Sequence, residues 1–275
     1  MARIARKLWG DYIINDGLEA AEAPFAKVPQ VMLSTIRDIK GKYYTDKGTV
    51  DYAAIKTSPE YADYRKIAAR LRDFDLRLLT DEGEKLAFWI DLYNTIVVDG
   101  IIALGIKGSV KEVLGFFGRI KYIIGGHLFS PDDMEHGILR ANSRPYMRAF
   151  RQFGPFDVRK GFALKEVDPR THFALVCGSR SCPPIKFYTS EGINRELDTA
   201  AVSFINSSEV IVIPEEKKVV ISMIFKWYEA DFGGRTGVLD FIEKYLVDDA
   251  RKEFIRKENG NIRVEYLYYD WNLNQ

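Results

Sequence analysis

Two cysteines and a histidine lie within thirteen consecutive residues, "HFALVCGSRSCPP" (172–184). The stretch "THFALVC" is rich in strand-forming residues and predicts a strand that ends at Cys177. A cysteine at such a position can act as a nucleophile, because the following glycine allows close backbone approach and consecutive N–H groups stabilise an anion. Cys177 is therefore a candidate nucleophile, with the backbone of Gly178 and Ser179 as candidate oxyanion donors.

Other interpretations of this stretch stay open. A free cysteine is often a buried small hydrophobe, so Cys177 can be purely structural. In a straight strand, residues an odd number apart point to opposite faces, which separates His172 from Cys177 and favours a structural, hydrogen-bonded His172. A zinc site would have three ligands here, including Cys182, but lacks the usual tight spacing and a fourth ligand. A reversible disulfide between the two cysteines is the remaining alternative, although their spacing is looser than that of CxxC redox motifs.

The best partner for Cys177 is His136. Ser130 is a good N-cap, with Pro131 as the first residue of a predicted helix over 131–140. Asp132 precedes His136 by one helical turn and lies on the same face. A carboxylate beside an imidazole raises the pKa of the imidazole and fixes its tautomer, as a general base requires. An exposed, charge-paired histidine is the alternative.

The apolar segment 84–104 predicts a buried helix with a polar stripe made of Asp91, Asn94, Thr95 and Asp99. It is long enough to span a membrane, but carboxylates near the middle of a span are costly, so a core helix is favoured. Such a stripe is usually the wet edge of a helix. It can also line a cleft, in which Asn94 or Asp91 would orient a histidine.

Composition excludes several classes of protein. The 40 Lys and Arg residues nearly balance the 39 Asp and Glu residues, so no bulk charge attracts nucleic acid or an anionic membrane. Two cysteines in 275 residues do not make a secreted disulfide scaffold. The N-terminal sequence lacks the apolar core of a signal peptide, so we expect a cytoplasmic protein unless a signal has been removed. No metal or cofactor is predicted.

Elsewhere the sequence predicts helices over about 25–80, a β-hairpin over 119–130 turning at Gly125-Gly126, and loops with short helical turns over 141–170. It also predicts a helix over 190–207, a hairpin over 209–222, short helices at 223–232, 236–246 and 248–257, and a strand over 262–271. Residues 1–27 form a peripheral N-terminal segment, and a helix is expected within residues 1–24. Helices and strands are segregated, which favours an α+β fold with a helical N-terminal half followed by short hairpins and packed helices.

Five segments together resemble a known family. They are "AFWIDLYNTIVV" (87–98), "FSPDDMEHGILR" (129–140), "DPRTHFALVCGSRSCPPI" (168–185), "IFKWYEADF" (224–232) and "YDWNLN" (269–274). In this order they resemble the family catalogued as domain of unknown function 547, over about residues 28–275. The family's usual WINLYNA carries Asp91 at its first asparagine here, and its usual NCG carries Val176 before Cys177.

The resemblance implies one globular domain over 28–275 and places His136 and Cys177 in the family's most recognisable motifs. It implies no established activity. Our leading hypothesis is a cysteine-dependent hydrolase or acyl/thiol transferase with His136 as base and Asp132 or Asn94 as the group that orients it. Its substrate would be a small molecule or a peptide. The alternatives are a non-enzymatic interaction domain with a protein partner and a zinc or thiol-redox site.

Overall fold

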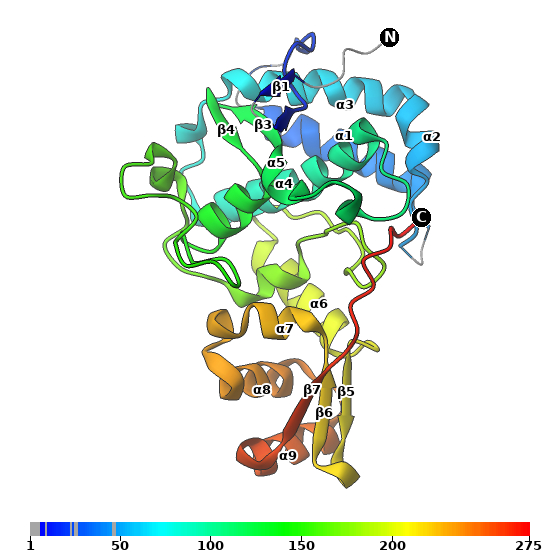
Figure 1. Ribbon diagram of the computed structural model, residues 1–275, viewed down its shortest axis with the longest axis vertical. Helices are drawn as coiled ribbons and strands as arrows, with labels where there is room; N and C mark the ends of the chain where they lie inside the picture. Colours follow the sequence, from blue (N-terminus) through cyan, green and yellow to red (C-terminus); the bar gives the residue numbers. More distant parts are fainter. Residues whose placement is uncertain (1–5, 9, 23, 25–26, 46–47) are drawn as a thin grey trace. The chain divides into compact units, whose positions relative to one another are not determined.

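The computed structural model describes residues 6–8, 10–22, 24, 27–45 and 48–275 of the chain (Figure 1). The chain divides into two compact units. Unit 1 comprises Met1–Glu166, Leu175–Ile193 and Trp271–Gln275, and unit 2 comprises Val167–Ala174 and Asn194–Asp270. Helices and two small sheets make up the described chain, which confirms the α+β class. The single globular domain over 28–275 stays a prediction. Four residues of the stretch 25–80 where helices are expected, 25, 26, 46 and 47, lie outside the described residues.

The helices of unit 1 are α1 (Val28–Tyr43), α2 (Tyr52–Thr57), α3 (Pro59–Arg70), α4 (Glu82–Leu104) and α5 (Phe116–Arg119). The long helix α4 begins at the N-cap Asp81, whose carboxylate accepts the N–H of Glu84 at 3.1 Å, and ends at Gly105 in the left-handed conformation. By length and composition α4 could cross a membrane, but 83% of its most apolar window is buried inside the protein. It is therefore the core helix that the sequence predicts.

The sheet of unit 1 has the order β1-β2-β3-β4. Its strands are β1 (Arg6–Leu8), β2 (Asp11–Ile13), β3 (Ile120–Ile124) and β4 (His127–Phe129). The antiparallel β3–β4 hairpin confirms the prediction, and both turn residues, Gly125 and Gly126, have positive φ. The expected N-terminal helix is wrong for the described residues, because β2 pairs in parallel with β3. The buried Asn15 fixes this arrangement by hydrogen bonds to Ala68 and Ile123.

Unit 2 holds a second sheet with the order β5-β6-β7, drawn in yellow to red in Figure 1. Its strands are β5 (Val210–Ile213), β6 (Lys218–Ile221) and β7 (Arg263–Tyr266). Its helices are α6 (Ile193–Ile205), α7 (Met223–Trp227), α8 (Gly234–Tyr245) and α9 (Asp249–Glu258). The first residue of α6, Ile193, is also the last residue of a unit 1 segment. The β5–β6 hairpin and the three short helices confirm the prediction. β7 is shorter than expected and pairs in parallel with β6.

The strand predicted for "THFALVC" is wrong. Pro169–Phe173 is a 3-10 helix, and residues 175–177 are irregular. Asp168 starts this helix by accepting the N–H of Arg170 at 3.0 Å, with Pro169 at the first position, where proline is favoured. The argument that strand geometry separates His172 from Cys177 therefore no longer holds.

The helix that carries His136 is also unlike the expected α-helix. The predicted cap is present, since Ser130 and Asp133 exchange backbone and side-chain hydrogen bonds of 3.0–3.1 Å. Beyond it, Asp133–Leu139 is a π-helix. A Cβ atom at Gly137 would lie 2.3 Å from the ring of Phe153, so only glycine fits at this close approach. Stretches of π-helix are rare and are frequent at functional sites.

Candidate functional site

Cys177 lies in a tightly bonded loop in unit 1, next to Cys182. The two sulfur atoms are 3.1 Å apart and are not joined by a disulfide. The backbone N–H of Cys177 donates to the Cys182 sulfur at 2.9 Å, and the Cys177 sulfur lies 3.0 Å from Oγ of Ser179. The Cys182 N–H donates to the Ser179 carbonyl at 3.1 Å, which closes a turn between the cysteines. The structure therefore brings together both thiols, of which the leading hypothesis uses Cys177 and the disulfide alternative uses both.

Two residues of the α4 polar stripe hold the loop segment that carries the cysteines. Oδ1 of the buried Asn94 accepts the N–H of Val176 at 2.7 Å, directly before Cys177. The carboxylate of the buried Asp91 accepts the N–H of Tyr188 at 3.2 Å. A buried backbone N–H needs such a partner, so the core helix dictates the path of the loop on both sides of the cysteines. Asn94 and Asp91 thus position backbone, and the role of orienting a histidine stays a prediction.

Gly178 turns the chain directly after Cys177. Its φ is +78°, and a Cβ atom in its place would lie 2.6 Å from Cδ1 of Ile101 in α4. A side chain is therefore excluded both by backbone conformation and by space. Gly178 and Ser179 are buried, whereas Cys177, directly before them in the chain, is half-buried. The loop presents the thiol while its backbone stays inside the protein.

The segment Trp271–Gln275 closes over the same loop. Asn274 donates its N–H to the Gly178 carbonyl at 3.1 Å, and Arg180 donates its N–H to the Asn272 carbonyl at 2.9 Å. The Asn274 side chain accepts the hydroxyl of Tyr52 at 2.8 Å and donates to the Gly48 carbonyl at 3.0 Å. The "YDWNLN" motif thus links the cysteine loop to Gly48 and Tyr52 through hydrogen bonds of Asn274.

Tyr52 lies where this closing segment meets the cysteines. An ideal Cβ atom at Gly178 would lie 3.4 Å from the Tyr52 hydroxyl, which is a close contact. Burial raises the pKa of Tyr52, and charges on Tyr44, Cys177 and Cys182 raise it further. Tyr52 therefore stays neutral and donates a hydrogen bond beside the thiols.

His136 lies in the π-helix of unit 1, buried between a cation and an anion. Its Nδ1 is 2.9 Å from a guanidinium nitrogen of Arg140 and 3.6 Å from a carboxylate oxygen of Glu135. Burial lowers the pKa of His136; the Glu135 carboxylate raises it, and the Arg140 guanidinium lowers it. Arginine only donates hydrogen bonds, so Nδ1 accepts, and the neutral ring carries its proton on Nε2. His136 is neutral at pH 7, and the charges of Glu135, Arg140, Asp132 and Arg148 all act on it.

Asp132 and Asp133 have other partners. Asp132 pairs with Arg148 at 2.7 Å, and Asp133 pairs with Arg159 at 3.0 Å. The charge of Asp132 raises the pKa of His136, as the sequence predicts, while the Asp132 carboxylate also pairs with Arg148. Glu135 raises the pKa of His136 more strongly than Asp132 does. Cys177 and His136 as a nucleophile–base pair stay a prediction.

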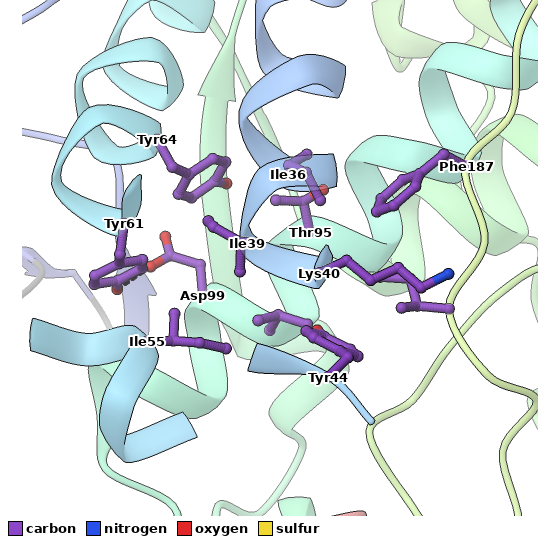
Figure 2. Close-up of a pocket in the computed structure, with 12 residues that line it drawn as sticks. Ile36, Ile39, Lys40, Tyr44, Ile55, Tyr61, Tyr64, Thr95, Asp99 and Phe187 are labelled. Carbon is purple, nitrogen blue, oxygen red and sulfur yellow. Dashed lines mark hydrogen bonds between the residues drawn. The ribbon is translucent and has the colours of Figure 1, made fainter. Parts of the chain in front are cut away.

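The other two residues of the α4 stripe, Thr95 and Asp99, line a narrow apolar pocket (Figure 2). Asp99 lies at one end beside Tyr61, whose hydroxyl donates to it at 2.5 Å, and Arg65 pairs with Asp99 at 2.8 Å. Lys40 lies at the other end, its ammonium 5.5 Å from the ring centre of Phe187. The pocket has room for about one water molecule, so we assign it no ligand.

His172 lies in unit 2, where its contacts are structural. Its Nε2 is 2.9 Å from the carboxylate of Asp231, and its ring stacks on Tyr228 with centres 3.8 Å apart. Both side chains of the His172–Asp231 pair are almost fully buried. The part of the chain that the structure describes holds no cluster of three or more His, Cys, Asp or Glu side chains arranged for a metal ion.

The fold and the site define an α+β protein with a half-buried cysteine pair on a loop that is held by a core helix. The family model described as "Protein of unknown function, DUF547" matches residues 76–205. The match covers α4, the π-helix and the cysteine loop, and over these residues it confirms the resemblance seen in the sequence. No curated protein matches the chain. No solved structure matches it either.

Sequence reasoning missed two members of the site, namely Glu135 and Asn274, whereas helical spacing does place Arg140 one turn after His136. Glu135 is adjacent to His136 in sequence, which was a usable signal. Asn274 lies in a motif that the resemblance identified, but no local pattern connects it to Gly178.

Proposed function

We propose that the protein is a cysteine-dependent enzyme, a hydrolase or an acyl/thiol transferase, with Cys177 as its nucleophile. One observation carries the proposal: the Cys177 thiol is half-exposed on a backbone that Asn94, Gly178 and the closing segment hold in place. A preorganised nucleophile avoids the cost of ordering it during the reaction. The interaction-domain alternative would be favoured by a fully buried Cys177, and it loses that support.

In the proposed reaction, the Cys177 sulfur bonds to an acyl carbon of the substrate and the bond from this carbon to the leaving group breaks. The thiol proton passes through His136 to the leaving group. Water or a second thiol then attacks the thioester, the bond from carbon to sulfur breaks, and a proton returns to Cys177. The backbone N–H groups of Gly178 and Ser179 are the proposed donors to the negatively charged oxygen in both steps.

The contact of Arg140 with His136 sets a condition on this scheme. His136 has a lowered pKa and is neutral at pH 7, as a base must be. Its proton-accepting atom, however, is Nδ1, which the Arg140 guanidinium covers at 2.9 Å. The base role therefore requires Arg140 to leave Nδ1 when substrate binds.

Thiol labelling tests the proposal. In Cys182→Ser protein, which keeps Cys177 as its one cysteine, the rate of alkylation by iodoacetamide is measured against pH. We expect a midpoint below the value of about 8.5 of a free thiol, and a return toward that value when His136→Gln is added. Incubation with p-nitrophenyl acetate should leave an acetyl adduct on Cys177, seen by mass spectrometry and absent from Cys177→Ser protein. A midpoint near that of free cysteine together with no adduct would refute the proposal.

A second function, dithiol–disulfide exchange, is favoured by the 3.1 Å separation of the two sulfur atoms. In this reaction Cys177 and Cys182 lose two protons and two electrons to a small-molecule disulfide, which becomes two thiols. Incubation with oxidised glutathione should give an internal disulfide that mild reductant reverses. A lasting mixed disulfide on Cys177 in the wild-type protein would contradict this function, because Cys182 would then have failed to displace glutathione.

A further inference from the structure

Large apolar side chains are exposed in the segment 144–160 of unit 1, which we call the 144–160 loop. The side chains of Met147, Phe150 and Phe156 are 89%, 84% and 96% exposed, and Val158 is 69% exposed. Scattered exposed apolar residues are normal on a protein surface, but four of this size within twelve residues are not. Their exposure in water costs free energy unless another surface covers them.

The loop is anchored, so the exposure is built into the fold. The side-chain amide of Asn142 bonds both the N–H and the carbonyl of Phe153, at 2.7 and 3.1 Å. The buried Phe153 ring packs against Gly137 of the π-helix. Arg148 pairs with Asp132, and Arg159 pairs with Asp133, which fixes the loop on both sides of Phe153. These anchors present Met147 and Phe150 on one side of Phe153, and Phe156 and Val158 on the other.

Three cations without a carboxylate partner accompany the exposed apolar residues, with Arg144 before them, Arg151 among them and Lys160 after them. The loop contains four arginines, one lysine and a single carboxylate, that of Asp157. Within the described residues, no carboxylate pairs with Arg144, Arg151 or Lys160. The loop is therefore strongly basic in a chain whose formal net charge is only +1.

We propose that the 144–160 loop is a binding surface for an anionic lipid bilayer, in which its apolar side chains enter the interface and its cations meet lipid phosphates. Apolar and basic residues alternate along the loop, and this mixture suits the boundary between headgroups and acyl chains. Another protein would need carboxylates opposite each separate cation and pockets for each apolar side chain. A fluid surface satisfies both requirements without matched geometry.

Vesicle flotation tests this inference with the full chain. Vesicles of phosphatidylcholine alone are compared with vesicles that contain 30% (about a third) phosphatidylserine, since anionic lipid supplies the attraction for the cations. We expect binding to the anionic vesicles, weakened by added salt, and little binding to the neutral ones. The double variant Phe150→Ser/Phe156→Ser should bind roughly a hundredfold more weakly, because each buried Phe contributes about tenfold. The triple variant Arg144→Gln/Arg151→Gln/Lys160→Gln should also bind roughly a hundredfold more weakly, at about fivefold per charge.

The matched control is Val247→Ser/Tyr268→Ser, which removes two exposed apolar residues outside the loop, and it should bind as the wild type does. All substituted side chains are exposed, so the variants should keep the melting temperature of the wild type. Equal binding of the Phe variant and the control, or no binding by the wild type, would overturn the inference. So would wild-type self-association in the absence of vesicles that the Phe variant abolishes, since a second copy would then cover the loop. These outcomes are independent of cysteine chemistry, because the assay can use Cys177→Ser protein.

Discussion

Replacing Gly178 by alanine tests how the cysteine loop is held against α4. A side chain at φ +78° costs about 1–2 kcal/mol in backbone strain. Its Cβ would also lie 2.6 Å from Cδ1 of Ile101, and overpacking of this kind costs about 1–3 kcal/mol. Gly178→Ala should therefore lower the free energy of unfolding by about 2–5 kcal/mol. Urea unfolding measures this loss.

The two contributions can be separated. Gly126 has the same φ of +78° with nothing within 4 Å of its Cβ position, so Gly126→Ala should show the backbone cost alone. Ile101→Val removes the clashing Cδ1 and by itself costs about 0.5–1.5 kcal/mol. Combined with Gly178→Ala, it should restore about 1–3 kcal/mol relative to the sum of the single effects. Equal costs at Gly126 and Gly178, or additive effects of the pair, would refute the packing argument.

Three further outcomes follow from contacts in the two units. Asn94→Leu leaves the buried N–H of Val176 without this acceptor, so urea unfolding should show a free energy of unfolding lower by about 1–3 kcal/mol. The loosened loop should also let iodoacetamide alkylate Cys177 faster, and an unchanged rate of alkylation would contradict the positioning role of Asn94. The pKa of His136 lies below its unfolded value of 6.5, so the folded state binds fewer protons and the protein loses stability as pH falls below 6.5. His136→Gln should remove this loss between pH 7.5 and 5.5, and identical pH slopes for both proteins would show that another group is responsible. Asp231→Ala leaves the buried Nε2 of His172 without this hydrogen-bond partner and should cost about 1–3 kcal/mol in urea unfolding. A loss below about 0.5 kcal/mol would mean that this contact is dispensable.

Local sequence was sufficient for the features that nearby residues control. The Gly125-Gly126 hairpin and the Ser130–Asp133 cap both depend on residues only a few positions apart, and both were predicted correctly. The strand at "THFALVC" failed because its strand-forming residues compete with two stronger signals. Asp168 and Pro169 start a 3-10 helix, and Asn94, far away in sequence, takes the N–H of Val176.

The candidate site shows the same division between local and distant causes. Cys177 was chosen as a candidate nucleophile from the turn residues that follow it. Asn94, however, accepts the backbone N–H of Val176, which lies more than eighty residues away in sequence. The partner of Asp132 is likewise decided by Arg148, sixteen residues later in the chain. Overall composition also hid a local property, because a net charge of +1 averages out the basic 144–160 loop.

The closing segment has a consequence for biosynthesis. The ribosome adds about 5–20 residues per second, and Asn274 emerges roughly one hundred residues after Gly178. Until then the Gly178 carbonyl and the Tyr52 hydroxyl have no Asn274 to bind, so the cysteine loop is completed only after the whole of unit 2 has been synthesised. A nascent chain therefore carries its thiols on an unfinished loop, and the hydrogen bonds that complete this loop form only once translation has passed β7.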